Sequence, residues 1–161
     1  MLLRKCIVFI FSSLLMIGYA FAGQLDFYDT NGKMVTLSNL KGKWVVVNYW
    51  ADWCGACIQE IPELNNFNEN IKDKNIVFYG VDYDELSLDS LKSSIASVDI
   101  KFPVLTADPG FLWNLGSVEV IPTTFIINPE GRVAKVITGP NTERSLMNTI
   151  NALQTTSASA K

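Results

Sequence analysis

Four apolar runs of strand length dominate the hydrophobic pattern of this chain. Residues 44–49 and 76–81 are almost continuously apolar, which is typical of buried central strands. Residues 123–127 and 133–138 are apolar and β-branched, and the turn sequence Asn-Pro-Glu-Gly over residues 128–131 joins them. So short a turn predicts that the last two strands pair antiparallel.

Three further segments place apolar residues three or four positions apart, as on one face of a helix. The first helix is expected over residues 54–70, and the missing N–H of Pro62 inside it predicts a kink. Ser87 suits the cap of a second helix, and Asn141 or Thr142 that of a third. The apolar stripes are Cys57, Ile61, Leu64 and Phe67 in the first helix, Leu91, Ile95 and Val98 in the second, and Leu146, Ile150 and Leu153 in the third.

Weaker signals predict the remaining elements. Residues 25–28 and 34–36 are expected to form an N-terminal hairpin, because the Asn-Gly pair at residues 31–32 is a strong two-residue turn signal. Residues 104–105 suit a brief strand. Residues 109–115 suit a short helix, since they begin with proline, which is favoured at the first helical position.

The order of these elements is ββ, then βαβα, then ββα. Strands that alternate with helices pair parallel, and the final pair is antiparallel. The expected fold class is therefore α/β, with a central mixed β-sheet flanked by helices and an N-terminal β-hairpin extension. One domain is expected over residues 23–154, followed by a flexible polar tail over residues 155–161.

The first 22 residues have the pattern of a secretory signal peptide. Arg4 and Lys5 precede an almost wholly apolar stretch over residues 7–16, and residues 20–22 are Ala-Phe-Ala, which suits cleavage before Gly23. The alternative is an uncleaved membrane anchor, since the apolar stretch is near the short limit for a span.

Composition excludes several classes of function. The chain has 13 basic and 16 acidic residues, and without Arg4 and Lys5 of the leader the net charge changes from −3 to −5. No basic cluster is visible, so nucleic acid is not an expected partner. The absence of histidine excludes a Ser-His-Asp or Cys-His hydrolase and a haem-attachment motif. It also argues against zinc and copper sites, because too few soft ligands remain.

The main candidate chemistry is a Cys-x-x-Cys motif between a buried strand and a helix. Cys54 would lie at the helix N-terminus, where unpaired N–H groups and the helix dipole stabilise a thiolate. Cys54 is therefore the expected attacking thiolate, and Cys57, one turn further in, is the expected resolving thiol. Gly55 and Ala56 between them carry no charge, which favours a reducing pair. A static structural disulfide is the alternative interpretation.

Three segments around this motif are similar to a known family. They are Trp-Ala-Asp-Trp-Cys-Gly-Ala-Cys over residues 50–57, the later Pro62, and Ile-Pro-Thr-Thr over residues 121–124. Together they resemble a thioredoxin-fold protein, and Cys-x-x-Cys-x-x-Glu-x-Pro over residues 54–62 is similar to the exported TlpA/ResA-like thiol–disulfide oxidoreductases of bacteria. The resemblance spans roughly residues 23–153 and implies a thioredoxin-like fold, with disulfide exchange that needs no organic or metal cofactor.

The resemblance also implies roles for residues near the cysteines. Glu60 is expected to lie near the dithiol and to accept a proton from Cys57, with an ordinary solvated helix glutamate as the alternative. Pro122 is expected to follow a cis peptide bond. Such a bond turns the backbone of Ile121 toward Cys54, where it can pair with an extended substrate segment.

Other residues near the motif have weaker expected roles. Trp53 is expected on the exposed apolar rim of a substrate cleft beside the cysteines, and Trp50 is expected in the core. Gly139 is a candidate for a further wall of this cleft, beside the motif and the proline loop. The acidic residues 82–85 are expected to form a solvated loop. Asn48 stands where ordinary thioredoxin has a buried aspartate, so a proton-transferring acid is not available there.

The expected function is that of an exported thiol–disulfide oxidoreductase that mainly reduces disulfides of periplasmic or other extracytoplasmic proteins. The resemblance suggests apocytochrome c, during cytochrome c maturation, as the substrate. A membrane thiol transporter is the expected electron donor, and nothing in the sequence demands more than a monomer. Two alternatives stay open, namely a disulfide oxidase or isomerase, and a module that binds unfolded chains with an incidental dithiol.

Overall fold

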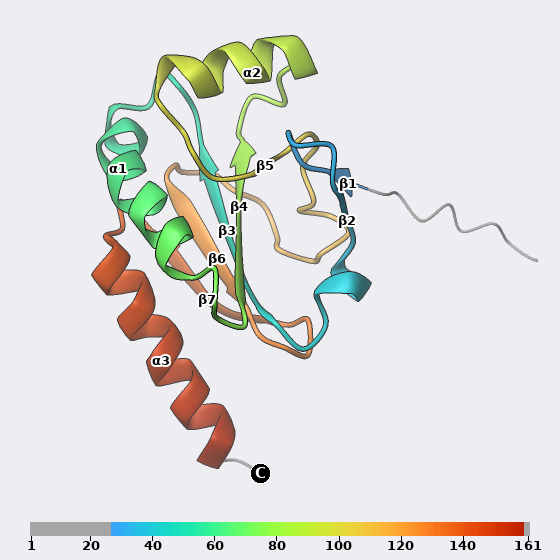
Figure 1. Ribbon diagram of the computed structural model, residues 1–161, viewed down its shortest axis with the longest axis vertical. Helices are drawn as coiled ribbons and strands as arrows, with labels where there is room; N and C mark the ends of the chain where they lie inside the picture. The colour runs from blue at the N-terminus through green and yellow to red at the C-terminus, as the bar shows by residue number, and fades with distance from the viewer. Residues whose placement is uncertain (1–26, 160–161) are drawn as a thin grey trace, which may run out of the picture.

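A five-stranded mixed sheet forms the centre of the computed structural model, which describes residues 27–159 (Figure 1). The expected leader and the first residues of the expected hairpin lie outside this range. The strand order is β5-β4-β3-β6-β7, in which β3 pairs parallel with β4 and antiparallel with β6, so the predicted mixed sheet is confirmed. The strands are β3 (Trp44–Trp50), β4 (Ile76–Asp82), β5 (Val104–Leu105), β6 (Thr123–Ile127) and β7 (Val133–Thr138).

β3 is the middle strand, and all seven of its residues are buried. Successive side chains of a strand point to opposite faces of the sheet. Val45 and Val47 therefore belong to the core cluster on one face, whereas Val46 and Trp50 belong to the cluster on the other. Asn48 is the polar residue of this strand and shares the face of Val46.

Three helices pack against the same face of the sheet as Val46. Ile61, Leu91 and Leu146 represent the three helices in that core cluster, and α1 and α3 lie side by side in Figure 1. No helix within residues 27–159 is long and apolar enough to cross a membrane. The helices are α1 (Gly55–Asn70), α2 (Leu88–Ser97), which Ser87 caps as expected, and α3 (Glu143–Ser159).

α3 is longer than the sequence suggested. Thr142 caps it, because its Oγ1 accepts a hydrogen bond from Ser145 N at 3.1 Å. α3 ends at Ser159, so residues 155–159 of the tail expected over residues 155–161 are helical, and the flexibility of that tail stays a prediction. Neither glycine nor proline interrupts this part of the chain. In addition, the hydroxyls of Thr155, Thr156 and Ser157 donate to carbonyls four residues earlier and so stay within the helix.

The N-terminal hairpin forms a separate two-stranded sheet, β1 (Phe27–Tyr28) and β2 (Met34–Val35). Its loop has three residues, 30–32, rather than the expected two, and the glycine of this loop adopts a positive φ of 77°. β2 is one residue shorter than expected, because Thr36 instead caps the short 3₁₀ helix η1 (Leu37–Leu40). Apolar side chains of the hairpin cover the sheet face opposite the helices.

The short helix expected over residues 109–115 is wrong. Two turns replace it, closed by bonds from Trp113 N to Pro109 O and from Leu115 N to Gly110 O. The positive φ of Asn114, 52°, ends the helical course there. This segment is fixed by its side chains instead, since the Trp113 ring packs edge-on against a hairpin phenylalanine in the second core cluster.

The neighbours of Gly80 leave no room for a side chain at this position. A Cβ at Gly80 would lie 2.8 Å from Phe102 Cε2 and 3.1 Å from Trp50 Nε1. We expect Gly80→Ala to lower the free energy of unfolding by about 1–3 kcal/mol, as other overpacked cores do. Gly55→Ala is the control, because a Cβ there meets nothing within 4 Å. Equal denaturation midpoints for the two variants would contradict the prediction.

Candidate active site

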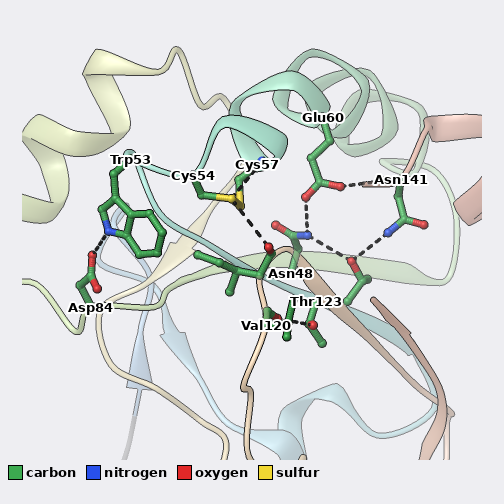
Figure 2. The surroundings of a disulfide bond; sticks show 11 residues. Asn48, Trp53, Cys54, Cys57, Glu60, Asp84, Val120, Thr123 and Asn141 are labelled. Atoms are coloured by element: carbon green, nitrogen blue, oxygen red, sulfur yellow. Dashed lines mark hydrogen bonds between the residues drawn. A yellow bond between two sulfur atoms is a disulfide. The ribbon is translucent and has the colours of Figure 1, made fainter. Parts of the chain in front are cut away.

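Cys54 and Cys57 form a disulfide where β3 leads into α1 (Figure 2). Cys54 is the N-cap residue of α1, and its Sγ accepts a hydrogen bond of 3.2 Å from Cys57 N. Cys54 is 7% exposed and Cys57 is 0% exposed, so Cys54 is the sulfur that a substrate can reach. In the reduced state the same N–H and the helix dipole would stabilise a Cys54 thiolate.

The proline loop faces the disulfide. The Ile121–Pro122 peptide bond is cis, and the carbonyl oxygen of Ile121 lies 3.8 Å from Cys54 Sγ. Thr123 Oγ1 donates to Val120 O at 2.6 Å and ties the two sides of the loop together. Gly139 lies behind the loop, because its N–H donates to the carbonyl of Pro122. The backbone N–H of Gly139 is therefore already occupied and is not free for a substrate.

Glu60 is 2% exposed, which excludes the solvated helix glutamate considered above. Its Oε1 accepts a hydrogen bond of 2.8 Å from Asn48 Nδ2, and its Oε2 accepts one of 2.7 Å from Asn141 N. Burial raises the pKa of Glu60 from 4.5 to about 7, and these two N–H donors oppose the rise. Glu60 follows Cys57 by three residues on α1, so a carboxyl group that titrates near neutral pH shares the helix face of the buried cysteine.

A buried hydrogen-bond network continues from Glu60 across the sheet (Figure 2). Asn48 Nδ2 donates to Thr124 Oγ1 at 3.1 Å, and Asn141 Nδ2 donates to the same oxygen at 3.2 Å. Sequence reasoning missed this group. In the sequence, Asn48 stands out only as the replacement of an acid, and Asn141 only as a candidate helix cap. Asn48 is the polar residue of an otherwise apolar strand, and Thr124 is one of two threonines that begin an apolar strand, which is a signal that could have identified them.

Trp50 and Trp53 lie in opposite environments. Trp50 is buried in the core, and its Nε1 has no partner within the described residues. Trp53 is 62% exposed beside the disulfide, and its Nε1 donates to Asp84 Oδ2 at 2.6 Å. The ring of Tyr83 packs edge-on against that of Trp53 at 6.5 Å. An aromatic pair anchored by a carboxylate thus borders the site.

The solvated loop expected over residues 82–85 is wrong for Asp82. This residue ends β4, is buried, and accepts a hydrogen bond from Leu86 N at 3.0 Å. Burial raises the pKa of its carboxyl group above the ordinary value. The rest of the segment is exposed, as expected.

The other residues of the motif add little polar chemistry. Gly55 is exposed, Ala56 packs against the helix-side core, and Pro62 is exposed inside α1. The kink expected at Pro62 stays a prediction. Within residues 27–159, no three His, Cys, Asp or Glu side chains are grouped as metal ligands.

Comparison with known proteins agrees with this arrangement. The family model described as Redoxin matches residues 20–153. The chain is 36% identical over 126 residues to thiol-disulfide oxidoreductase ResA of Bacillus subtilis (strain 168), covering 78% of this chain and 70% of that one.

Solved structures agree as well. The exposed lipoprotein thioredoxin Etrx1 of Streptococcus pneumoniae strain TIGR4 has a TM-score of 0.69 and 27% identity over 79% of this chain and 97% of that one. A thioredoxin-family thiol:disulfide interchange protein of Chlorobium tepidum TLS has a TM-score of 0.66 and 26% identity over 80% of this chain and 91% of that one. The chain therefore belongs to the Redoxin family and is a ResA-like thiol–disulfide oxidoreductase with the thioredoxin fold.

Proposed function

We propose that this protein works mainly as a reductant of disulfides in extracytoplasmic proteins. The observation that carries the proposal is the composition of the turn between the cysteines. Gly55 and Ala56 bring no charge to Cys54, so the thiolate depends on the helix N-terminus and on one N–H donor. A thiolate with so little stabilisation belongs to a pair that gives up electrons readily.

Catalysis begins when the Cys54 thiolate attacks a substrate disulfide. The substrate bond breaks, one substrate sulfur leaves and takes a proton, and the other stays bonded to Cys54. Cys57 then bonds to Cys54 and gives its proton to the carboxylate of Glu60, and the second substrate sulfur leaves as a thiolate, which water protonates. The substrate has gained two electrons and the Cys54–Cys57 pair has lost them. Glu60 suits this role because its pKa of about 7 lets it gain and lose a proton near neutral pH.

Substrate chains are proposed to bind along the proline loop. Trp53 offers an exposed aromatic ring on one side of Cys54, and the backbone of Ile121 offers polar groups on the other. An extended segment with apolar side chains would use both. Apocytochrome c, which the resemblance to ResA-like proteins suggests, is a substrate of this kind.

The signal-like leader supports export of the domain, with cleavage before Gly23 or retention as an anchor. A membrane thiol transporter is proposed to reduce the disulfide again, because no soluble thiol pool is expected in that compartment. The protein is proposed to act as a monomer.

The reduction potential of the Cys54–Cys57 pair tests this function. We expect a value near or below about −220 mV, at the thioredoxin and glutaredoxin end of the scale, because no charge between the cysteines favours the thiolate. Equilibration with glutathione or dithiothreitol buffers, followed by the fluorescence of Trp53, would measure it. A value near about −120 mV would instead identify a disulfide-forming oxidase.

A further inference from the structure

Asn48 lies at the centre of the buried network with half of its amide unpaired (Figure 2). Its side chain is 0% exposed. Nδ2 donates to both Glu60 Oε1 and Thr124 Oγ1, at 2.8 and 3.1 Å. Oδ1, in contrast, has no hydrogen-bond partner within the described residues. Buried amide oxygens are usually paired, so an unpaired Oδ1 is unusual. In this orientation the amide offers Glu60 a donor and no acceptor, which suits the carboxyl group while it is ionised.

The two carboxyl oxygens of Glu60 differ in whether they can carry the proton of the neutral acid. Oε2 faces the backbone N–H of Asn141, a donor that cannot turn into an acceptor. When Glu60 is protonated, its proton therefore belongs on Oε1, which faces Asn48. The Nδ2 group would then oppose an O–H group with another N–H donor, and the bond would be lost.

Rotation of the Asn48 amide by half a turn removes this conflict. Nitrogen and oxygen exchange places in a group of nearly the same shape, so the packed core need not move. Oδ1 then lies within hydrogen-bond distance of Glu60 Oε1 and Thr124 Oγ1, and it can accept from both O–H groups. In either orientation the amide atom that points away from Glu60 and Thr124 lacks a partner. That atom therefore favours neither orientation over the other.

We propose that Asn48 is a positioning residue whose amide turns with the protonation state of Glu60, donating to the carboxylate and accepting from the acid. The proposal rests on the proposed function of Glu60 as proton acceptor for Cys57. When Cys57 resolves the mixed disulfide, its proton moves to Glu60 Oε1 and the amide turns to accept it. Loss of that proton to solvent returns the amide to its donor orientation.

Few other titratable groups face Glu60. On its own helix the nearest ionisable residues in the sequence are Glu63 and Cys57, of which Cys57 is held in the disulfide, and the Glu63 carboxylate accepts a hydrogen bond from the backbone N–H of Glu143 at the start of α3. β3 and β6 present only the amide of Asn48 and the hydroxyl of Thr124 to the network. No neighbouring charge contributes to the raised pKa of Glu60. A change in the hydrogen bonding of the Asn48 amide can therefore be compared with the titration of Glu60 alone.

Nuclear magnetic resonance of the oxidised protein between pH 5 and 9 tests the proposal without any substrate. The Glu60 carboxyl carbon and the Asn48 side-chain nitrogen are followed together. We expect the Nδ2–H hydrogen bond to Glu60 to be present above the Glu60 midpoint and lost below it. An Asn48 bond that persists unchanged through the Glu60 titration would overturn the proposal. An oxidising potential for the cysteine pair would overturn the proposed reductant but not this result.

Asn48→Leu supplies a functional readout. Asn48→Leu removes the bond to the carboxylate and the bond to the acid. Because the charge-assisted bond to the carboxylate is the stronger of the two, the Glu60 midpoint is expected to rise, by up to about one pH unit. Mixed-disulfide resolution should then be up to about fivefold slower at pH 7, since the ionised fraction of Glu60 falls from about one half to about one tenth, with recovery at higher pH. Val46→Ala, a truncation of the same strand on the same face, is the control for destabilisation alone and is expected to leave the pH profile in place. An unshifted profile in Asn48→Leu would contradict the proposal, and if that variant does not fold, the resonance experiment on the native chain decides.

Discussion

Replacing Cys54 by serine is expected to abolish disulfide reduction, with a loss on the order of 10³-fold or more. A serine hydroxyl is far less nucleophilic than the thiolate that the N-terminus of α1 favours, and the remaining thiol of the motif, that of Cys57, is fully buried. Reduction of a disulfide-bonded protein with dithiothreitol as the electron source would measure the loss.

Replacing Cys57 by serine is expected to give a different failure. Cys54 can still attack, but nothing resolves the product, so a mixed disulfide with the substrate should accumulate. This species is visible as a band of higher mass on a non-reducing gel and should be absent when both cysteines are serine. If the double variant keeps its biological effect, the protein is a binding module with an incidental dithiol.

The main elements of the fold could be predicted from the sequence because their signals are local. The apolar run of β3 and the stripe of α1 each fit one type of regular structure, and the structure has both where expected. Residues 109–115 could not be predicted in the same way. Proline is compatible with a helix start, but the conformation was decided by the left-handed backbone of Asn114 and by packing of Trp113 on the hairpin.

The candidate site likewise has one part that local sequence determines and another that depends on distant parts of the chain. The positions of Cys54 and Cys57 follow from one short motif, which fixes the strand end, the helix start and the spacing. The environment of Glu60 does not, because its partners Asn48 and Asn141 lie 12 and 81 residues away in the chain. Helical spacing placed Glu60 on the face of Cys57, but burial depends on which strands and loops close over that face.

Replacing Glu60 by glutamine is expected to remove a large pH dependence of stability. In the unfolded chain Glu60 loses its proton near pH 4.5, whereas in the folded protein burial delays this until about pH 7. Between these values the folded state binds more protons, so its stability falls as the pH rises. The shift corresponds to about 3 kcal/mol, lost between pH 4.5 and 7 and constant above.

Urea denaturation of the oxidised protein at pH 4.5 and pH 8, followed by tryptophan fluorescence, would measure this loss. Glu60→Gln should lose about 3 kcal/mol less than the native chain between the two pH values. If the glutamine amide bonds differently from the carboxyl group it replaces, the free energy of unfolding of the variant changes by the same amount at both pH values. Glu130→Gln, in an exposed turn, is the matched control and should follow the native chain. If Glu60→Gln follows it too, Glu60 is not held neutral by burial, and its role as the proton acceptor for Cys57 loses its physical basis.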